Sequence, residues 1–436
     1  MIKKLVLVFI AVFAIQLHAQ QGTASPYSFY GLGSHKFKGT VENRSMGGLS
    51  IYTDSIHVNL RNPASYATPN LAYFNKESRP IKFSVGGGYS SLGLKTSNGS
   101  DNASATSFNY LALSIPMGRF GFGFGIMPST SVGYKLESIN ADGTISNRFR
   151  GEGGVNKAFL GFGYQIYEGL SIGVDAQYNF GSIKNSIIEF VYDDDGVPLQ
   201  NQSRENNRAD LSGLNFNLGM SYKKMLNENL EFVSGLTYSI ESKLTSQNQR
   251  SFSTIAFNNN TGEELVFANI DVDLEALGLK ETELTLPSKV SVGAGIGSPR
   301  KWFVGAEYLF QNTSNSTNAI LSSSSGETFE DASKISLGGF YIPQYNSFTS
   351  YLKRVVYRGG LYFEKTGLIL NDEPIKEFGM SFGVGLPVGD VFSNVNLGLE
   401  IGKRGTTNSN LIQENFINLQ LSLSLNDKWF GKRKYD

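Results

Sequence analysis

Histidine is the first residue type to consider, because it serves as a general base or metal ligand near neutral pH more often than other side chains. The sequence holds three, His18, His35 and His57, and no cysteine. His18 falls in an export signal, and the other two lie outside the serine-bearing strands, so a Ser-His site has no support. No HExxH, Walker or dinucleotide-binding pattern occurs. We therefore expect no catalysis, no cofactor and no metal.

Three consecutive carboxylates, Asp193, Asp194 and Asp195, form the cluster best suited to a hard cation. They lie in a segment that is expected to be an outer loop. A solvated acidic turn explains them as well as weak Ca²⁺ binding does, and we favour the turn.

Six charged residues occur in extended segments that are otherwise apolar on one face and small or polar on the other. Charges on the inner face of a membrane barrel are tolerated only when hydrated or paired. Ion pairs with an N-terminal plug are the favoured use, and a polar gate or a site for a ligand headgroup is the alternative. The fork of Arg358 suits a carboxylate, either from the plug or from a bound fatty acid. The six residues are Asp175, Glu307, Arg358, Glu364, Glu400 and Arg404.

The segments that carry these charges alternate strictly. In residues 170–181, every even-numbered residue is apolar and every odd-numbered one is polar or glycine. Similar stripes occur in residues 302–311, 378–387, 395–402 and 417–425. Alternation over about ten residues is typical of strands in a transmembrane barrel.

A secreted β-sandwich would also alternate, because one face of each sheet is buried. Here the second face is rich in Gly, Ser and Asn rather than in Lys, Glu and Thr, and aromatic residues recur near the stripe ends, as in an interfacial girdle. No stretch after the leader approaches the length of an apolar helical span. We predict an all-β fold, a transmembrane antiparallel β-barrel with an N-terminal plug.

The connections alternate in length, as they do in outer-membrane barrels. Seven longer loops are expected at 96–103, 138–147, 192–207, 246–283, 312–332, 365–374 and 404–410. Short turns are expected around Gly118, Glu168, Asn227, Pro299, Asn346 and Gly389. This pattern predicts about 14 strands, an even number that leaves both termini on the periplasmic side.

Residues 1–19 have the features of a secretory signal peptide. Lys3 and Lys4 precede the apolar run 5–15, and Leu17-His18-Ala19 provides small-residue cleavage after Ala19. The run is too short to span a bilayer. We expect the mature chain in the cell outer membrane of a Gram-negative bacterium. The formal net charge of zero gives no basic field for nucleic acid.

Residues 20–79 do not alternate, whereas residues 80–436 do. A barrel of this strand number encloses a lumen that its own side chains cannot fill. We therefore predict that residues 20–79 enter the lumen as a plug, or hatch, and that residues 80–436 form the barrel. A disordered periplasmic tail is the alternative, and the apolar content of the segment argues against it. Within it, Asn62 can cap a helical turn whose first position is Pro63.

Short motifs in this region resemble the FadL family of long-chain fatty-acid transport barrels, whose hatch carries an Asn-Pro-Ala element. They are Arg44-Ser45-Met46-Gly47-Gly48, Asp54 and Asn62-Pro63-Ala64-Ser65-Tyr66. A second set resembles the Bacteroidota branch with PorV-type barrels: Leu286-Pro287-Ser288-Lys289, Phe382-Gly383-Val384-Gly385-Leu386-Pro387 and Asn426-Asp427-Lys428-Trp429-Phe430.

The FadL resemblance implies passive uptake of a hydrophobic, fatty-acid-like molecule through a plugged lumen, with lateral release into the outer-membrane lipid. Candidate ligand-binding or gating residues are Asn62, Pro63, Ala64, Arg358, Glu307, Glu364, Glu400 and Arg404. The PorV-type resemblance implies instead a non-transporting subunit of an outer-membrane secretion or assembly complex, with other proteins of that complex as partners.

The longest predicted loop carries an apolar set with three open interpretations. It could form an entrance groove, pack on itself or contact a partner protein. Its members are Leu265, Phe267, Ile270, Val272, Leu274, Leu277 and Leu279.

Overall fold

The computed structural model describes residues 22–67, 81–140, 142–258, 262–313, 327–388 and 393–427. The expected signal peptide, the end of the expected plug (residues 68–79) and the Lys428-Trp429-Phe430 motif lie outside these residues. Within the described ranges, no helix has the length and apolarity to cross a membrane.

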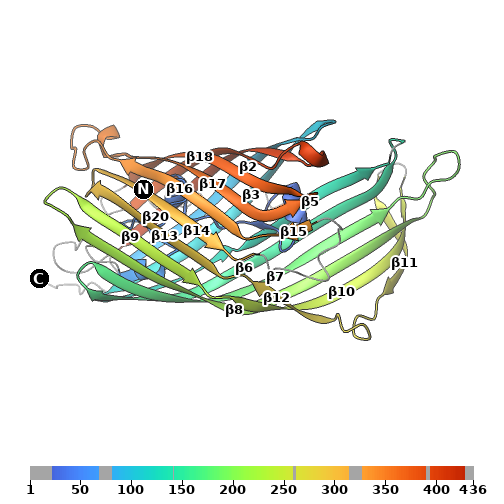
Figure 1. The fold of residues 1–436 in the computed structure, drawn as a ribbon, viewed down its shortest axis with the longest axis horizontal. Helices are drawn as coiled ribbons and strands as arrows, with labels where there is room; N and C mark the ends of the chain where they lie inside the picture. The colour runs from blue at the N-terminus through green and yellow to red at the C-terminus, as the bar shows by residue number, and fades with distance from the viewer. Residues whose placement is uncertain are drawn as a thin grey trace, which may run out of the picture.

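The described residues form a closed antiparallel barrel of fourteen strands, which confirms the predicted fold class (Figure 1). Strand β2 pairs with β3 on one side and with β20 on the other, and this second pairing closes the barrel. Ten strands are single segments: β2 (Ile81–Lys95), β3 (Ser100–Met117), β6 (Ile145–Tyr167), β7 (Leu170–Glu189), β8 (Gln202–Met225), β14 (Trp302–Gln311), β17 (Val356–Leu370), β18 (Glu373–Val388), β19 (Ser393–Arg404) and β20 (Gln413–Asp427).

The other four strands are each broken into consecutive segments. They are β4 (Phe120–Pro128) with β5 (Thr130–Ile139), β9 (Glu231–Ser239) with β10 (Ser242–Phe257), β11 (Glu264–Asp271) with β12 (Glu281–Leu286) and β13 (Lys289–Ser298), and β15 (Glu327–Phe329) with β16 (Ala332–Tyr341).

The predicted alternation of faces is present along the wall. On β7, Ile172, Val174 and Tyr178 are exposed on the outer surface, whereas Asp175 and Asn179 are buried inside. The outward apolar residues form the belt that meets lipid, because alternate side chains of a strand point to opposite faces.

The two ends of the barrel differ in their connections, and three of these depart most clearly from prediction. We call the end with residues 118–119, 168–169 and 299–301 the turn end, and the opposite end the loop end. The turn-end connection at Asn346 is long, since it runs from Tyr341 to Val356. The expected loop at 365–374 is a two-residue turn, Asn371-Asp372, whose φ angles of 49° and 64° suit a tight hairpin.

The third difference is the expected loop 246–283, which is mostly sheet. Strands β10, β11 and β12 continue the wall beyond the belt at the loop end (Figure 1). Residues 245–251 of β10 are polar on both faces, and residues 265–268 of β11 are apolar on both faces, so the alternation that marks a membrane strand is absent from both segments. Leu265, Phe267 and Ile270 are exposed on β11, and Leu274 is buried.

Residues 22–67 lie inside the barrel, where they form η1 (Pro26–Phe29), β1 (Ser34–His35), α2 (Val41–Arg44) and η2 (Pro63–Ala67) (Figure 1). We call these residues the inner segment. The turn η2 packs against the inner face of β4, β6 and β7. Gly121 of β4 makes this approach possible, because a Cβ atom there would overlap the carbonyl oxygen of Tyr66.

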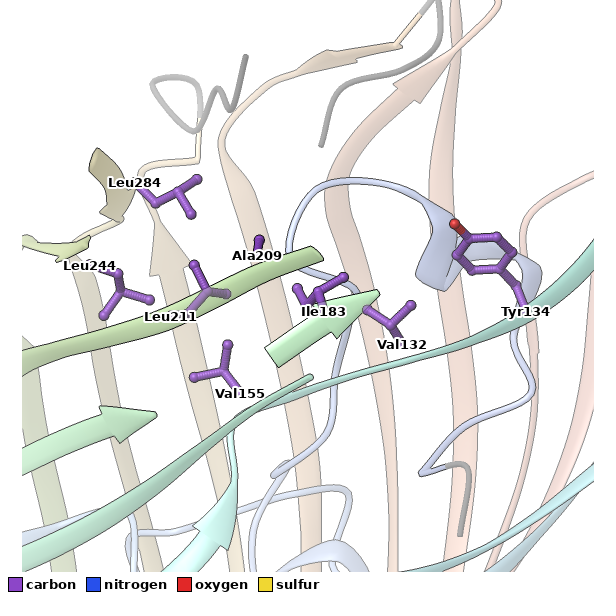
Figure 2. Packing of buried hydrophobic residues seen from close by; sticks show 8 residues of the cluster. All are labelled: Val132, Tyr134, Val155, Ile183, Ala209, Leu211, Leu244 and Leu284. Carbon is purple, nitrogen blue, oxygen red and sulfur yellow. The ribbon is translucent and has the colours of Figure 1, made fainter. Parts of the chain in front are cut away.

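Part of the inner wall near the loop end is aliphatic, contrary to the expectation of a small or polar inner face. Figure 2 shows these side chains on adjacent strands from β5 to β12, with the blue inner segment beside Tyr134. Phe29 and Leu32 of the inner segment pack against this cluster. Its members are Val132, Tyr134, Val155, Ile183, Ala209, Leu211, Leu244 and Leu284.

Candidate functional site

Two buried ion pairs join the inner segment to the wall. The guanidinium of Arg44 lies 2.6 Å from Glu400, and that of Arg61 lies 2.6 Å from Glu307. Glu307 also accepts hydrogen bonds from the backbone N–H and hydroxyl of Ser50 and from the hydroxyl of Ser291. Both carboxylates are buried, so their charges depend on these partners.

A third connection is a network on β17 to β20. Lys38 of the inner segment pairs with Glu377 and lies 3.9 Å from Glu364. Arg404 lies 2.5 Å from Glu377 and 3.4 Å from Glu414. The hydroxyl of Tyr362 lies 2.6 Å from Glu377 and 2.7 Å from Glu400, and so bridges two of the three ion-pair sites.

Asn62, Pro63 and Ala64 occupy the start of η2. The side-chain oxygen of Asn62 accepts a hydrogen bond from the N–H of Ala64 at 3.0 Å, and Pro63 is the first residue of the turn. The amide nitrogen of Asn62 donates to the carbonyl of Met220 on β8 at 2.9 Å. These contacts hold the turn against the wall, as the capping pattern predicts.

All six inner-face charges point inward as predicted, and their roles differ. Glu307, Glu364 and Glu400 face cations of the inner segment, and Arg404 pairs with carboxylates of the wall. Asp175 is buried on β7. Arg358 forms no ion pair with any described residue, and it lines a cavity at the turn end. A role of these residues in gating or ligand binding stays a prediction.

Sequence reasoning did not single out the partners Lys38, Arg44 and Arg61, or the wall residues Glu377 and Glu414. A signal for the first three was present, because the expected plug carries several isolated cations and the expected wall carries inward carboxylates. No rule from one sequence matches a given cation to a given strand.

The wall is interrupted between β3 and β5. Strand β3 pairs with β4 from Met117 to Leu111, and its residues 100–110 pair with β2 alone. Strand β5 pairs with β6 and, over two residues, with β1, and no described residue joins it to β3. Pro128 ends β4 at this point, and a proline has no N–H to donate to a neighbouring strand.

The first part of the inner segment, residues 22–36, fills this break. Ser34 pairs with Ser131 of β5, and the hydroxyl of Ser28 accepts a hydrogen bond from the N–H of Gly133 at 3.1 Å. On the other side, Ala24 and Ala103 of β3 pack against the same buried cluster, which consists of Leu92, Tyr362 and Phe416. The inner segment thus covers backbone groups of β5 that another strand would otherwise bind.

A larger hollow of about 1050 Å³ lies at the loop end, under the connection from β11 to β12. Its lining is largely charged, whereas the apolar residues of this region led us to consider an apolar entrance groove. Arg150 and Arg204 both bind Glu264, at 2.7 and 2.9 Å.

The architecture defines the fold as a closed β-barrel with an inner segment, and this fold is similar to that of FadL-type outer-membrane barrels. Among solved structures, the toluene transporter TodX of Pseudomonas putida has a TM-score of 0.59 and 16% identity, with 91% of this chain and 99% of that chain covered. The toluene transporter TbuX of Ralstonia pickettii has a TM-score of 0.53 and 15% identity, with 88% and 97% covered. A FadL homologue of Pseudomonas aeruginosa has a TM-score of 0.57 and 12% identity, with 90% and 99% covered. At these identities the likeness shows the fold.

The chain belongs to the BamG family, whose model matches residues 1–436. A search of curated proteins found no match. The FadL resemblance inferred from sequence is therefore correct for the fold, while the family that matches the sequence is a different one. The PorV-type branch stays a prediction.

Proposed function

We propose that the barrel lies in the outer membrane with its turn end toward the periplasm, and that it passes a small hydrophobic molecule sideways into the lipid between β3 and β5. The observation that carries this proposal is the position of the break. It begins level with Ile126, the last outward apolar residue of β4, and Phe108 of β3 is exposed beside it. An opening at this level would lead to hydrocarbon.

The same break suggests which part of the inner segment moves. Breaking a buried ion pair typically costs about 3–5 kcal/mol. Residues 38–61 are held by several such pairs, whereas no ion pair involves residues 22–36 among the described residues. Displacement of residues 22–36 alone is therefore the low-energy way to open the break, and the ion-paired remainder stays in place.

Apolar surface is available along this route. The aliphatic cluster on β5 to β12 lies beneath Phe29 and Leu32, which belong to the part that would move. Its exposure would give a hydrophobic molecule a path from the loop end to the break. Among the similar solved structures, TodX is a toluene transporter and CymD is a monoaromatic hydrocarbon channel. A small aromatic compound is therefore the first ligand to test here. A fatty acid is the second.

A disulfide that fixes the inner segment to β5 at the break tests the route. The chain has no cysteine, so Ser34→Cys with Ser131→Cys forms a defined pair, and directly opposed residues of antiparallel strands have the spacing that a disulfide needs. Under oxidising conditions the variant should lose most uptake of labelled toluene into cells that lack the native gene, and a reductant should restore it.

The matched control joins two wall strands, with Asn147→Cys and Glu189→Cys at the loop end of β6 and β7. Uptake through the control should not respond to oxidation. Equal uptake by the oxidised and reduced Ser34/Ser131 variant would rule out movement at the break, and equal uptake by cells with and without the protein would rule out transport.

A subunit role in an outer-membrane secretion or assembly complex is the second candidate. The observation that favours it is apolar surface beyond the belt. Phe348 in the long turn-end connection is 100% exposed, and Ile270 on β11 is 69% exposed. Affinity purification at native expression, with mass spectrometry of proteins and lipids, separates the candidates. Stable outer-membrane protein partners favour the subunit role, and a lone barrel with a bound apolar compound favours transport.

A further inference from the structure

A cavity of about 100 Å³ lies at the turn end, between the inner segment and the wall strands β16 and β17. The exposed residues Arg300 and Tyr345 of two turn-end connections border it. It lies at the opposite end from the charged hollow, and none of its lining residues belongs to residues 22–36. The inference below thus goes beyond the proposed function and is independent of it.

Arg358 presents unused hydrogen-bond donors to this cavity. Its side chain is buried, with 7% of the residue exposed, and it donates one hydrogen bond, from Nη1 to the side-chain oxygen of Asn396 at 3.1 Å. No described carboxylate lies within ion-pair distance. A guanidinium has five N–H groups, so most of them lack a partner among the described residues.

Glu42 of α2 lines the same cavity, and its carboxylate lacks hydrogen-bond donors from the described part of the chain. It is 5% exposed, and neither of its carboxylate oxygens has a hydrogen-bond partner among the described residues. A buried charge without partners is strongly unfavourable. A ligand that supplies a donor to Glu42 and an acceptor to Arg358 would satisfy both groups together.

Two further titratable residues of the lining, Asp54 and His57, already bind each other. Asp54 lies 2.7 Å from Nδ1 of His57, and Nε2 of His57 lies 3.2 Å from Asn396. The remaining wall is mainly apolar, with Tyr52, Phe340 and Val356 among its members. Among the described residues, the site therefore combines the buried guanidinium of Arg358 and the buried carboxyl group of Glu42, neither in an ion pair, with an apolar surface, and Arg300 lies at its exposed border.

The size of the cavity limits the ligand. One water needs roughly 10–15 Å³ of such volume, so about 100 Å³ holds on the order of seven to ten water-sized groups. A leucine has nine non-hydrogen atoms and fits this space, and any group attached to its nitrogen would extend out of the cavity. A long acyl chain does not, so this cavity is no fatty-acid site.

We propose that the turn-end cavity binds a terminal α-carboxylate next to an N–H donor and a medium-sized apolar side chain. The carboxylate binds the fork of Arg358, the N–H group donates to Glu42, and the side chain packs against Tyr52, Phe340 and Val356. Both a free apolar amino acid and the C-terminal residue of a peptide carry this chemistry.

Calorimetric titration of the full-length protein in detergent tests the proposal with three probes. L-leucine and N-acetyl-L-leucine both have the carboxylate and an N–H donor, and leucinamide lacks the carboxylate. At least one of the first two should bind saturably, and leucinamide should not. Tighter binding of free leucine assigns the site to amino acids, and tighter binding of the acetylated form assigns it to peptide ends.

Two variants test the roles of the charged residues. Arg358→Gln should weaken binding by about tenfold or more, because a charge-assisted bidentate contact is lost. Glu42→Gln should weaken free leucine more than N-acetyl-leucine, because only the former carries an ammonium group. Arg148→Gln, at the loop end of β6, is the matched control and should bind as the wild type does.

Folding of each variant is checked by its heat-modifiable migration in gels. If Arg358→Gln does not fold, the comparison of leucine with leucinamide on the wild-type protein still shows whether binding requires the carboxylate. Equal binding of leucine and leucinamide, absence of binding by both carboxylate probes, or unchanged affinity of a folded Arg358→Gln variant would overturn the proposal.

Discussion

At the scale of single residues, the charges inside the barrel mainly position the inner segment. Glu307 shows this most clearly, since it receives Arg61, both donors of Ser50 and the hydroxyl of Ser291. Four donors from two parts of the chain converge on one buried carboxylate. Such a site is stable only when every partner is present.

Removal of one partner should therefore be more harmful than removal of both. Arg61→Met leaves the Glu307 charge uncompensated and should lower the free energy of unfolding by about 3–5 kcal/mol. The double variant with Glu307→Gln should recover a large part of this loss. Urea unfolding in detergent, followed by tryptophan fluorescence, measures both. A double variant less stable than Arg61→Met would contradict the assignment.

The Asp54–His57 pair predicts a pH dependence. Burial acts to raise the pKa of Asp54, but the His57 ring and the Lys82 ammonium outweigh it, and the pKa lies well below its ordinary value. The contribution of a carboxyl with a lowered pKa is complete above the unfolded-state pKa and is lost as the pH falls through the folded-state value.

Asp54→Asn should accordingly lower the thermal midpoint by a constant amount from neutral pH to about pH 5. The difference from the wild type should shrink below about pH 4, where the unfolded chain begins to bind the proton. Midpoints at pH 7, 5 and 3 test this. A difference that is equal at pH 7 and pH 3 would show that the pair does not lower the pKa of Asp54.

Much of the residue-level picture follows from alternation. The inward direction of Arg358 and Glu400 was predictable because every second residue of a strand faces the lumen. Their partners were not predictable from the sequence. Glu400, for example, binds Arg44 of the inner segment, which lies 356 positions away in the chain. Arg358 was expected to meet a carboxylate of the plug or of a bound ligand. It pairs with no carboxylate of the described residues and borders a cavity, so the ligand alternative stays a prediction.

At the scale of elements, the turn η2 depends on glycines of the wall. Gly121 and Gly123 lie where a side chain would overlap the backbone or ring of Tyr66. The alternation of β4 places both glycines on its inner face, toward the inner segment. The geometry explains why the stripe there is glycine rather than serine.

Gly121→Ala should displace η2 and reduce stability, because its Cβ would overlap a backbone atom that cannot rotate away. Gly93→Ala on β2 is the matched control, since the nearest atoms to its Cβ are 3.8 Å away. The control should stay within about 0.5 kcal/mol of the wild type. Urea midpoints and protease sensitivity of residues 60–67 measure the effect. Equal stability of the two variants would contradict the proposed packing.

The elements that sequence analysis missed are those that lack the alternation of apolar and polar residues typical of membrane strands. Strands β10 and β11 extend past the belt, and neither alternates, because residues 245–251 of β10 are polar on both faces and residues 265–268 of β11 are apolar on both faces. The break at Pro128 was equally invisible, because β4 and β5 continue one strand and only their lack of a partner on β3 marks the gap.

At the scale of the whole molecule, the barrel encloses an inner segment with two differently held parts. Residues 38–67 are fixed by ion pairs and by η2, and residues 22–36 fill the break with hydrogen bonds and apolar contacts. The transport proposal depends on this division. It assigns movement to residues 22–36, whereas residues 38–67 stay attached to the wall.

Hydrogen exchange of the protein in lipid nanodiscs, with and without saturating toluene, tests this division most directly. The account predicts faster exchange of residues 22–36 and of the facing edge of β5 when the compound is present, with residues 38–67 unchanged. Unchanged exchange throughout, or loosening of residues 38–67 together with residues 22–36, would contradict it.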